Sequence, residues 1–314
     1  MSNFTPHVLT LALGIALSAC ATAPPQAPAP APAAAAAPAC AGDYMAPGGT
    51  LHATAWMQRS AEYRALTSTT YRQAIPALAR LLTDAAASAD LKQAGTGATL
   101  PPAVVMDLDE TVLDNSAAQA RWLATGRCTG DFEPFWDEWT AEASAAAVPG
   151  AIGYIRSARA MRDPAGRAVR VIFVTNRECR APAGGADPCP QKQQTLDNLR
   201  KLGLDSPTLA QDTLMKGEQP GWGSEKQTRR DVVARDYRIL QLVGDDFGDF
   251  LEGARSSSVD EREAARCRYS ALWGERWILL PNPVYGSWQV RLVHSGRPPL
   301  EPGRPPVTFE CPQP

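Results

Sequence analysis

The chain has 314 residues, 44% of them hydrophobic, and a formal net charge of −2 from 31 basic and 33 acidic residues. A chain of this length and composition can bury a sizeable core, and its balanced charge argues against a polyanion, so we expect no nucleic-acid polymer as a partner. We find no internal repeat, which favours a single globular domain over residues 46–300, followed by a Pro-rich tail at 301–314.

The first residues have the pattern of an export signal. Residues 8–19, VLTLALGIALSA, form an apolar run that is too short for a permanent membrane span but suits a signal peptide covering residues 1–19. The following Cys20 completes the sequence LSAC, which resembles a bacterial lipobox, where cleavage before the cysteine leaves its thiol to carry a lipid. An ordinary signal peptide cleaved nearby is the alternative, and the absence of Lys or Arg before the run departs from the usual pattern.

Residues 21–41 contain no charged residue and are dominated by Ala and Pro. Such a segment cannot build a core and favours extended conformations, so we interpret residues 20–45 as a lipidated cysteine followed by a semi-rigid tether. The uncharged Ala21 favours the bacterial outer membrane over the inner one. A soluble periplasmic protein is the alternative.

The cysteine count fits an oxidising compartment. Without Cys20, six of the seven cysteines remain, which allow fifteen pairings, and the sequence cannot choose among them. Cys179 and Cys189 flank a Pro/Gly-rich loop, RAPAGGADP, that could close easily. A zinc cluster is the rival interpretation, but the chain has only three histidines and no C-x-x-C spacing. The six cysteines are Cys40, Cys128, Cys179, Cys189, Cys267 and Cys311.

Apolar runs of strand length alternate with segments of helical spacing. Leu196, Leu199 and Leu202 recur at helical spacing and are followed by Gly203, a helix stop. Buried strands that alternate with helices predict an α/β fold, with a parallel sheet covered by helices on both faces. The expected strands are residues 103–106, 169–174, 238–243 and 277–280.

A polar cluster follows each of the first three expected strands: DLDET after residue 106, TNR after residue 174 and GDDFGD after residue 243. Ligands of open α/β sheets bind beyond the carboxyl ends of the strands, so we expect these clusters to meet at one edge. A lone D-x-D would indicate little, because acidic loops are usually just solvated. Carboxylates that are forced together persist where a divalent cation neutralises them or where one carries a proton. Hard oxygen ligands in a small site suit Mg²⁺ that bridges to a substrate phosphate.

The motifs resemble those of the haloacid dehalogenase (HAD) superfamily. The longer series AWMQRSAEYRAL, DLDETVLDNS, AVPGA, VTNR, KLG, GDDFGDF and LLPNPVYGSW, in this order between residues 55 and 288, resembles the class C acid phosphatases of outer-membrane lipoprotein type. The resemblance implies a HAD-like Rossmannoid parallel sheet flanked by helices, with a small, mainly helical cap inserted at about 114–148. It also implies hydrolysis of small phosphomonoesters, including nucleoside 5'-monophosphates.

The resemblance assigns roles to four aspartates. Asp107 would be the nucleophile that forms an aspartyl phosphate, and Asp109 would act as general acid and then as general base. Asp107, the main-chain oxygen of Asp109 and the carboxylate of Asp245 would bind Mg²⁺. Asp249 would support a lysine or a metal-bound water. Asp246 departs from the family pattern, in which we expect asparagine, and its charge could tighten the metal site or lie outside it.

The same resemblance assigns phosphate binding to Thr175 and Asn176 in VTNR. Ser224, followed three residues later by Gln227, predicts a capping box that places Lys226 in the first turn of a helix. A helix N-terminus together with an ammonium suits phosphate, so Lys226 is expected to bind it. The arginines of the next turn are expected to cover the surface: Arg229 and Arg230.

The segment RWLATGRCTGDFEPFWDEW, residues 121–139, holds too many aromatic residues for a plain surface crossing. One interpretation is a small core inside the cap. The resemblance instead makes Trp136 or Trp139, together with Tyr285, a stack for the flat part of a nucleoside monophosphate or aryl phosphate. The aromatic residues of the segment are Trp122, Phe132, Phe135, Trp136 and Trp139.

The sequence therefore predicts a secreted, lipid-anchored, Mg²⁺-dependent acid phosphatase with 5'-nucleotidase activity. A non-catalytic lipoprotein that binds a nucleotide or haem is one rival, although it leaves the pair Asp107 and Asp109 unexplained. A phosphotransferase of the same fold, which passes phosphate to a hydroxyl instead of water, is the other. A homodimer stays open as an assembly.

Overall fold

The computed structural model of the protein describes residues 50–126, 132–181, 185–293 and Cys311. The expected signal peptide, lipobox and tether, together with Cys40 and Cys128, lie outside these residues. Among the described residues, no helix is both long enough and apolar enough to cross a bilayer.

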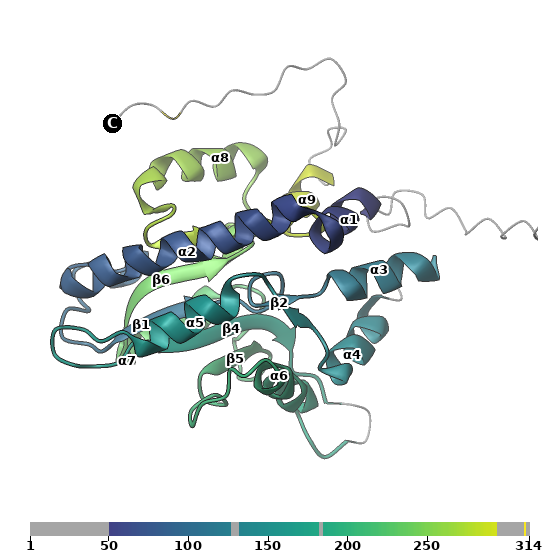
Figure 1. The fold of residues 1–314 in the computed structure, drawn as a ribbon, viewed down its shortest axis with the longest axis horizontal. Helices are drawn as coiled ribbons and strands as arrows, with labels where there is room; N and C mark the ends of the chain where they lie inside the picture. The colour runs from purple at the N-terminus through teal and green to yellow at the C-terminus, as the bar shows by residue number, and fades with distance from the viewer. Residues whose placement is uncertain (1–49, 127–131, 182–184, 294–310, 312–314) are drawn as a thin grey trace, which may run out of the picture. The chain divides into compact units, whose positions relative to one another are not determined.

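A parallel sheet of five strands forms the centre of the described residues, in the order β5-β4-β1-β6-β7 (Figure 1). The sheet confirms the predicted fold class, and four of its strands coincide with the four apolar runs, although β4 continues to Glu178. The strand β5 escapes sequence prediction because its four residues, TLMK, are few and end in a lysine. The strands are β1 (Pro102–Met106), β4 (Arg170–Glu178), β5 (Thr213–Lys216), β6 (Arg238–Gly244) and β7 (Trp277–Leu279).

Helices precede, connect and follow these strands, as an α/β fold requires (Figure 1). The described helices are α1 (Leu51–Arg59), α2 (Ala61–Thr83), α3 (Ser116–Thr125), α4 (Phe132–Glu142), α5 (Ala151–Ala160), α6 (Pro190–Lys201), α7 (Gln227–Asp236), α8 (Val259–Arg268) and α9 (Ser287–Val293). Single 3₁₀ turns occur at Leu91–Gln93, Phe247–Asp249 and Ser270–Leu272.

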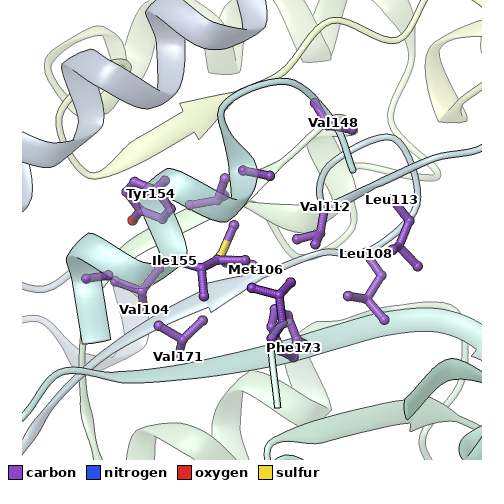
Figure 2. Packing of buried hydrophobic residues seen from close by; sticks show 14 of the residues in the cluster. Val104, Met106, Leu108, Val112, Leu113, Val148, Tyr154, Ile155, Val171 and Phe173 are labelled. Atoms are coloured by element: carbon purple, nitrogen blue, oxygen red, sulfur yellow. The ribbon is translucent and has the colours of Figure 1, made fainter. Parts of the chain in front are cut away.

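Strand β1 is buried on both faces, because successive side chains point to opposite sides of a strand and both sides are covered. Val104 and Met106 pack in a core cluster with residues of α2 and α5, whereas Val105 packs in a second cluster with Val233 of α7. Figure 2 shows the first cluster, including residues of α5 and β4: Tyr154, Ile155, Val171 and Phe173. The strand that carries the D-x-D motif is therefore held rigidly from both sides.

The segment predicted as a cap is bracketed by a small antiparallel ribbon. Strand β2 (Leu113–Asp114) pairs with β3 (Ala146–Ala147), and the chain between them contains α3 and α4. The described part of this insertion is mainly helical, as the sequence predicts. It begins directly after the D-x-D motif, so the cap is built on the edge of the sheet where that motif ends.

The helical spacing before Gly203 is confirmed by α6. Leu196 and Leu199 are buried on it, and Gly203 follows with a left-handed backbone, φ +71°. Such a backbone suits glycine and ends a helix.

The predicted capping box at the start of α7 is wrong. Lys226 itself is the cap residue, and no side chain caps the helix. The Gln227 side chain instead donates hydrogen bonds to Asp90 Oδ2 at 3.1 Å and to Asp231 Oδ1 at 2.7 Å. The partner Asp90 comes from a distant part of the chain, so a local sequence rule could not foresee it. Lys226 nevertheless lies at the helix N-terminus, where the sequence places it.

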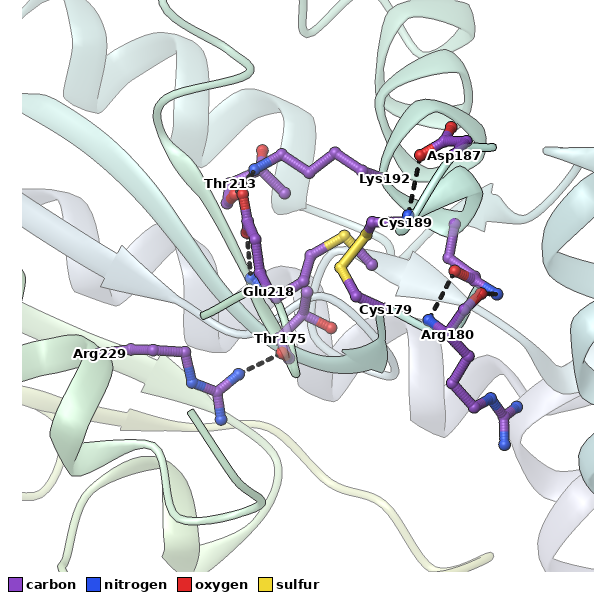
Figure 3. Close-up of a disulfide and its surroundings, with 11 residues drawn as sticks. Thr175, Cys179, Arg180, Asp187, Cys189, Lys192, Thr213, Glu218 and Arg229 are labelled. Carbon is purple, nitrogen blue, oxygen red and sulfur yellow. Dashed lines mark hydrogen bonds and ion pairs between the residues drawn. A yellow bond between two sulfur atoms is a disulfide. The ribbon is translucent and has the colours of Figure 1, made fainter. Parts of the chain in front are cut away.

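A disulfide joins Cys179, directly after β4, to Cys189, directly before α6 (Figure 3). It confirms the closure that the composition of the intervening loop favours. A second disulfide joins Cys267 of α8 to Cys311. Both cross-links fit an oxidising compartment.

Candidate active site

The polar clusters of three strands meet at one edge of the sheet. Strands β4, β1 and β6 are neighbours, so their carboxyl ends lie side by side. Asp107 follows β1, and its backbone N–H donates to the Val243 carbonyl of β6 at 2.9 Å. One carboxylate oxygen each from Asp107, Asp245 and Asp249 lies within 4.8 Å of the other two. The convergence that the sequence predicts is confirmed.

Lys226 joins two of these carboxylates. Its Nζ lies 2.5 Å from Asp107 Oδ1 and 2.6 Å from Asp249 Oδ1, and its side chain is only 6% exposed. Burial lowers the pKa of Lys226, but the charges of Asp107 and Asp249 outweigh burial and raise it. Lys226 is therefore a fixed cation beside Asp107.

The charge balance of the cluster favours a further cation. Burial raises the pKa of Asp107 to about 6, helped by Asp249 and Asp109 and opposed by Lys226. Burial, followed by the charges of Asp107 and Asp249, raises the pKa of Asp245 well above its ordinary range. One lysine cannot neutralise three carboxylates, whereas a divalent cation that prefers oxygen ligands can. This donor set fits Mg²⁺.

Asp245 is oriented by two neutral donors. Thr111 Oγ1 donates to one carboxylate oxygen at 3.2 Å, and Asn282 Nδ2 donates to the other at 2.8 Å. Asn282 belongs to the segment LLPNPVYGSW, which thereby reaches the carboxylate cluster.

The carboxylate of Asp109 is held by a buried cation instead of joining the cluster. Arg177 Nη2 lies 2.8 Å and Arg177 Nε 3.0 Å from Asp109 Oδ1, and the guanidinium side chain is 2% exposed. Asn115 Nδ2 donates to the same oxygen at 3.0 Å. The Asp109 carboxylate therefore lies outside the cluster of Asp107, Asp245 and Asp249, and metal binding by its main-chain oxygen stays a prediction.

Glu110 connects the D-x-D motif to Tyr285. It is 1% exposed and adopts a left-handed backbone, φ +58°. Its carboxylate accepts hydrogen bonds from the Asn115 backbone N–H at 2.9 Å and from the Tyr285 hydroxyl. Burial, followed by the charge of Asp109, raises the pKa of Glu110 well above its ordinary range.

Asp246 lies outside the carboxylate cluster, which answers the question that its departure from the family pattern raises. Its side chain accepts hydrogen bonds from the Ser287 backbone N–H at 2.6 Å and from the Gly248 N–H at 2.8 Å. These bonds, together with the Ser287 hydroxyl and Arg255, outweigh burial and lower the pKa of Asp246. Asp246 therefore joins the 3₁₀ turn that carries Asp249 to the start of α9.

Arg229 and Arg230 do not cover the surface, and the prediction that they do is wrong. Arg229 is fully buried and bonds to the Thr175 carbonyl (Figure 3) and to Asn176 Oδ1 at 2.6 Å. Arg230 is 1% exposed and donates to the Asp249 carbonyl at 2.8 Å. The terminal nitrogens of each arginine donate to oxygen acceptors on a loop of the site. They brace the loops that surround Lys226.

A cavity of about 380 Å³ opens above the carboxylates. Trp136 and Tyr285 line it, as one of the predicted pairs requires. Trp139 does not line it: its side chain packs in the core, and its indole N–H donates to Asn115 Oδ1 at 2.9 Å.

Thr175 is fully buried, and its hydroxyl accepts a hydrogen bond from the Arg177 N–H at 3.1 Å. A hydroxyl that accepts one bond can still donate, so phosphate binding by Thr175 stays a prediction. The residues that line the cavity above the carboxylates are Asp107, Asp109, Gln119, Phe132, Trp136, Asn176, Arg177, Lys226, Asp245, Asp246, Asp249, Arg255, Tyr285, Gly286, Gln289 and Val290.

Residues 47–288 match the family model described as HAD superfamily, subfamily IIIB (acid phosphatase). The chain belongs to this family. A solved structure of the class C acid phosphatase from Bacillus anthracis with tungstate bound is 31% identical over 77% of this chain and 87% of that chain, with a TM-score of 0.61. Another structure of the Bacillus anthracis enzyme aligns over the same shares with a TM-score of 0.60.

Membership of the acid phosphatase family makes the protein a phosphomonoesterase. It also explains the aspartate pair that a non-catalytic binding lipoprotein leaves without a purpose. The small-molecule substrate that we expect is therefore a phosphomonoester, and the cavity above Asp107 has the volume of a small-ligand site.

Several residues of this acid phosphatase site receive no role from the sequence. They lie inside motifs that the sequence makes conspicuous, DLDETVLDNS, VTNR and LLPNPVYGSW, but the motifs do not say which atoms meet. A cation three residues beyond the end of the predicted strand 169–174 is the one local signal for Arg177. These residues are Glu110, Thr111, Asn115, Arg177 and Asn282.

Proposed function

We propose that this acid phosphatase hydrolyses phosphomonoesters, including nucleoside 5'-monophosphates, by way of an aspartyl phosphate on Asp107. The contact between Lys226 and Asp107, beside Asp245 and Asp249, carries this proposal. A carboxylate that must attack a dianionic phosphate needs positive charge next to it, and Lys226 supplies that charge at the N-terminus of α7.

In the first half-reaction the Asp107 carboxylate forms a bond to phosphorus as the bond to the leaving oxygen breaks. Asp109 gives its proton to that oxygen, which an alcohol leaving group requires. In the second half-reaction a water attacks phosphorus, Asp109 takes up the proton of the water, and the bond to Asp107 breaks. Arg177 and Asn115 keep the Asp109 carboxyl in one place through both steps.

Mg²⁺ would be held by Asp107, Asp245 and the main-chain oxygen of Asp109. When bound, it neutralises negative charge on the phosphoryl oxygens. Asp249 is already engaged, because it accepts hydrogen bonds from the backbone of Asp245 at 3.1 Å and contacts Lys226. We therefore assign Asp249 to support of Lys226 and of the metal loop. Thr175 and Asn176, at the end of β4, would help to bind the phosphate.

Nucleotide hydrolysis is supported by the aromatic wall of the cavity. Trp136 and Tyr285 both line it and come from different elements, α4 and the loop before α9. Aromatic side chains stack on nucleobases irrespective of the base, so such a pair suits nucleoside monophosphates as a class.

The proposal on location rests on the lipobox-like sequence LSAC. We propose that Cys20 carries a lipid that anchors the enzyme to the bacterial outer membrane. Cys20→Ser should move the protein from the membrane fraction to the soluble periplasmic or culture fraction without loss of specific activity. Unchanged fractionation would refute the anchor. Sedimentation of the same soluble variant would show whether the enzyme forms a homodimer.

The decisive experiment measures phosphate release from phenyl phosphate and from nucleoside 5'-monophosphates, with and without a chelator. Hydrolysis of both substrates that stops on chelation and returns with Mg²⁺ is the expected result. Activity that survives chelation would contradict the metal assignment. Hydrolysis of phenyl phosphate alone would leave a phosphatase whose natural leaving group is not a nucleoside.

A further inference from the structure

We propose that Gln119 and Gln289 form a polar recognition site for the leaving group, in which their side-chain amides bond to hydroxyl or N–H groups of a nucleoside. The inference rests on the proposed nucleotidase activity and assigns to it the residues that select the leaving group. Both glutamines line the cavity that contains Asp107 and Asp109.

Gln119 is buried and lacks a partner for its amide oxygen. Gln119 is 2% exposed, and within the described part of the chain no donor reaches its Oε1. Burying a polar atom without a hydrogen bond costs free energy, so native proteins rarely leave one in this state without a reason. A donor brought by a ligand would supply the missing bond.

Two other buried glutamines have partners for their amide oxygens. Gln241 Oε1 accepts from the Tyr154 hydroxyl at 2.5 Å, and its Nε2 donates to the Ala74 carbonyl at 3.1 Å. Gln93 Oε1 accepts from the Ile239 N–H at 2.9 Å. Gln119 differs from both because its amide oxygen lacks a partner among the described residues and its side chain lines the cavity that contains Asp109.

The position of Gln119 follows from helix geometry. Asn115, directly before α3, contacts Asp109, and the Gln119 N–H donates to the Asn115 carbonyl at 3.0 Å. Residues four apart on a helix are neighbours on one face, with Cβ atoms about 5 to 6 Å apart. Gln119 therefore lies one turn beyond the residue that holds the general acid. Because Asp109 protonates the leaving oxygen, the atoms attached to that oxygen occupy the space next to Gln119.

Gln289 contributes from a separate element. It lies on α9, four residues after Tyr285, and Gln289 Oε1 is likewise buried without a partner among the described residues. Tyr285 offers a flat apolar surface, and Gln119 and Gln289 offer polar atoms from two helices. A nucleoside matches this combination, because its base can stack while its hydroxyls or N–H groups bond to the amides. A phenyl leaving group can only stack.

The test compares Gln119→Met and Gln289→Met, which keep most of the side-chain volume but remove the amide. The substrates are adenosine 5'-monophosphate, its 2',3'-dideoxy analogue and phenyl phosphate. We expect each variant to lower kcat/KM for adenosine 5'-monophosphate about tenfold more than for phenyl phosphate. The dideoxy analogue separates the two donor sources: a loss as large as that of adenosine 5'-monophosphate places the bond on the base, and a smaller one places it on the ribose.

Gln194→Met is the matched control. Gln194, on α6, also has a buried amide oxygen without a partner among the described residues, but it does not line the cavity. This variant should leave the ratio of the two kcat/KM values unchanged. Equal losses on both substrates in Gln119→Met and Gln289→Met, or no loss in either, would overturn the recognition site and leave the nucleotidase standing. Wild-type enzyme that hydrolyses phenyl phosphate but no nucleotide would overturn both, and the phosphatase would remain.

Discussion

Arg177 donates hydrogen bonds to Asp109 from two nitrogens of its guanidinium, Nη2 at 2.8 Å from Oδ1 and Nε at 3.2 Å from Oδ2. The arginine comes from the end of β4 and the aspartate from the loop after β1, so the pair joins two neighbouring strands at the edge of the sheet that carries the carboxylate cluster. A two-point contact fixes the plane of the carboxylate as well as its distance. Asp109 is thus oriented before substrate arrives.

Replacing this arginine should therefore damage catalysis more than binding. In Arg177→Gln the Asp109 carboxyl loses its fixed plane, and small displacements of a proton-transfer group can cost about 10² in rate. We expect kcat to fall by about that factor, while KM for phenyl phosphate changes little. Steady-state kinetics at saturating Mg²⁺ measures both quantities.

Arg170→Gln provides the control for Arg177→Gln. Arg170 lies at the opposite end of the same strand, where its Nε contacts Asp212 Oδ1 at 2.8 Å. Loss of this pair removes an ion pair from β4 without touching the site, so kcat should stay at the wild-type value. A similar fall in kcat in both variants would show that Arg177 acts only through the stability of the strand.

The parts of the site that could be predicted are those that depend on periodicity and topology. An apolar run fixes where β1 ends, and parallel pairing brings the end of β6 to the same edge, so Asp107 and Asp245 meet although 138 positions separate them. The strand β5 and the buried pair Arg229 and Arg230 could not be predicted in this way. Arginine usually lies at the surface, and only the folded chain brings carbonyl acceptors to the guanidinium groups of Arg229 and Arg230.

The aromatic cap shows the same limit at the scale of a single helix. Trp136 and Trp139 are three residues apart on α4, so the spacing places them on adjacent parts of its surface. It does not say which part faces the substrate. The hydrogen bond from Trp139 to Asn115 decides this, because it commits Trp139 to the cap core and leaves Trp136 at the cavity.

Asp246→Asn should destabilise the protein. The Asp246 carboxylate accepts bonds from two backbone N–H groups, those of Ser287 and Gly248, and an amide would place its own N–H₂ group against one of them or leave a donor unmet. An unsatisfied buried group costs about 1 to 3 kcal/mol, so we expect the free energy of unfolding at pH 7 to fall by about that amount. Urea titration measures it.

The pH dependence of this loss has a definite sign. The pKa of Asp246 is lowered in the folded protein, so its carboxylate adds stability above the unfolded pKa of about 3.9, and that stability is lost as pH falls through the lower folded value. The difference between wild type and Asp246→Asn should therefore be constant from pH 6 to 8 and shrink below about pH 4. A difference that grows on acidification would contradict the assignment.

Tyr285 has two separable functions. Tyr285→Ala removes the ring. The kcat/KM for a nucleoside monophosphate should then fall by a factor that corresponds to about 1 to 2 kcal/mol of lost transition-state stabilisation, the scale of base stacking on aromatic residues. A small aliphatic phosphate should be affected much less. Tyr285→Phe keeps the ring and removes only the hydrogen bond to Glu110, so it should retain most of the discrimination between the two substrates. Equal losses on both substrates in Tyr285→Ala would mean that the ring serves packing.

Asp109→Asn separates the two half-reactions. Phenolate departs with little proton assistance, so Asp107 should still be phosphorylated by phenyl phosphate, but the phospho-enzyme would lack its base for hydrolysis. We expect up to one equivalent of phenol in a rapid burst, followed by steady-state turnover that is lower by about 10² to 10⁴, the usual worth of general acid/base catalysis. Rapid-quench measurement of phenol release resolves both phases.

The same variant should respond differently to a nucleotide, because the alkoxide of its ribose needs a proton from Asp109 in order to leave. With a nucleoside 5'-monophosphate, Asp109→Asn should therefore show no burst. Asp107→Asn is the control for the nucleophile and should show neither burst nor turnover with either substrate. Wild-type steady-state rates in Asp109→Asn would eliminate its acid/base role. A burst in Asp107→Asn would place the nucleophile on another residue, and Lys226 would then have to be paired with a carboxylate that does not react.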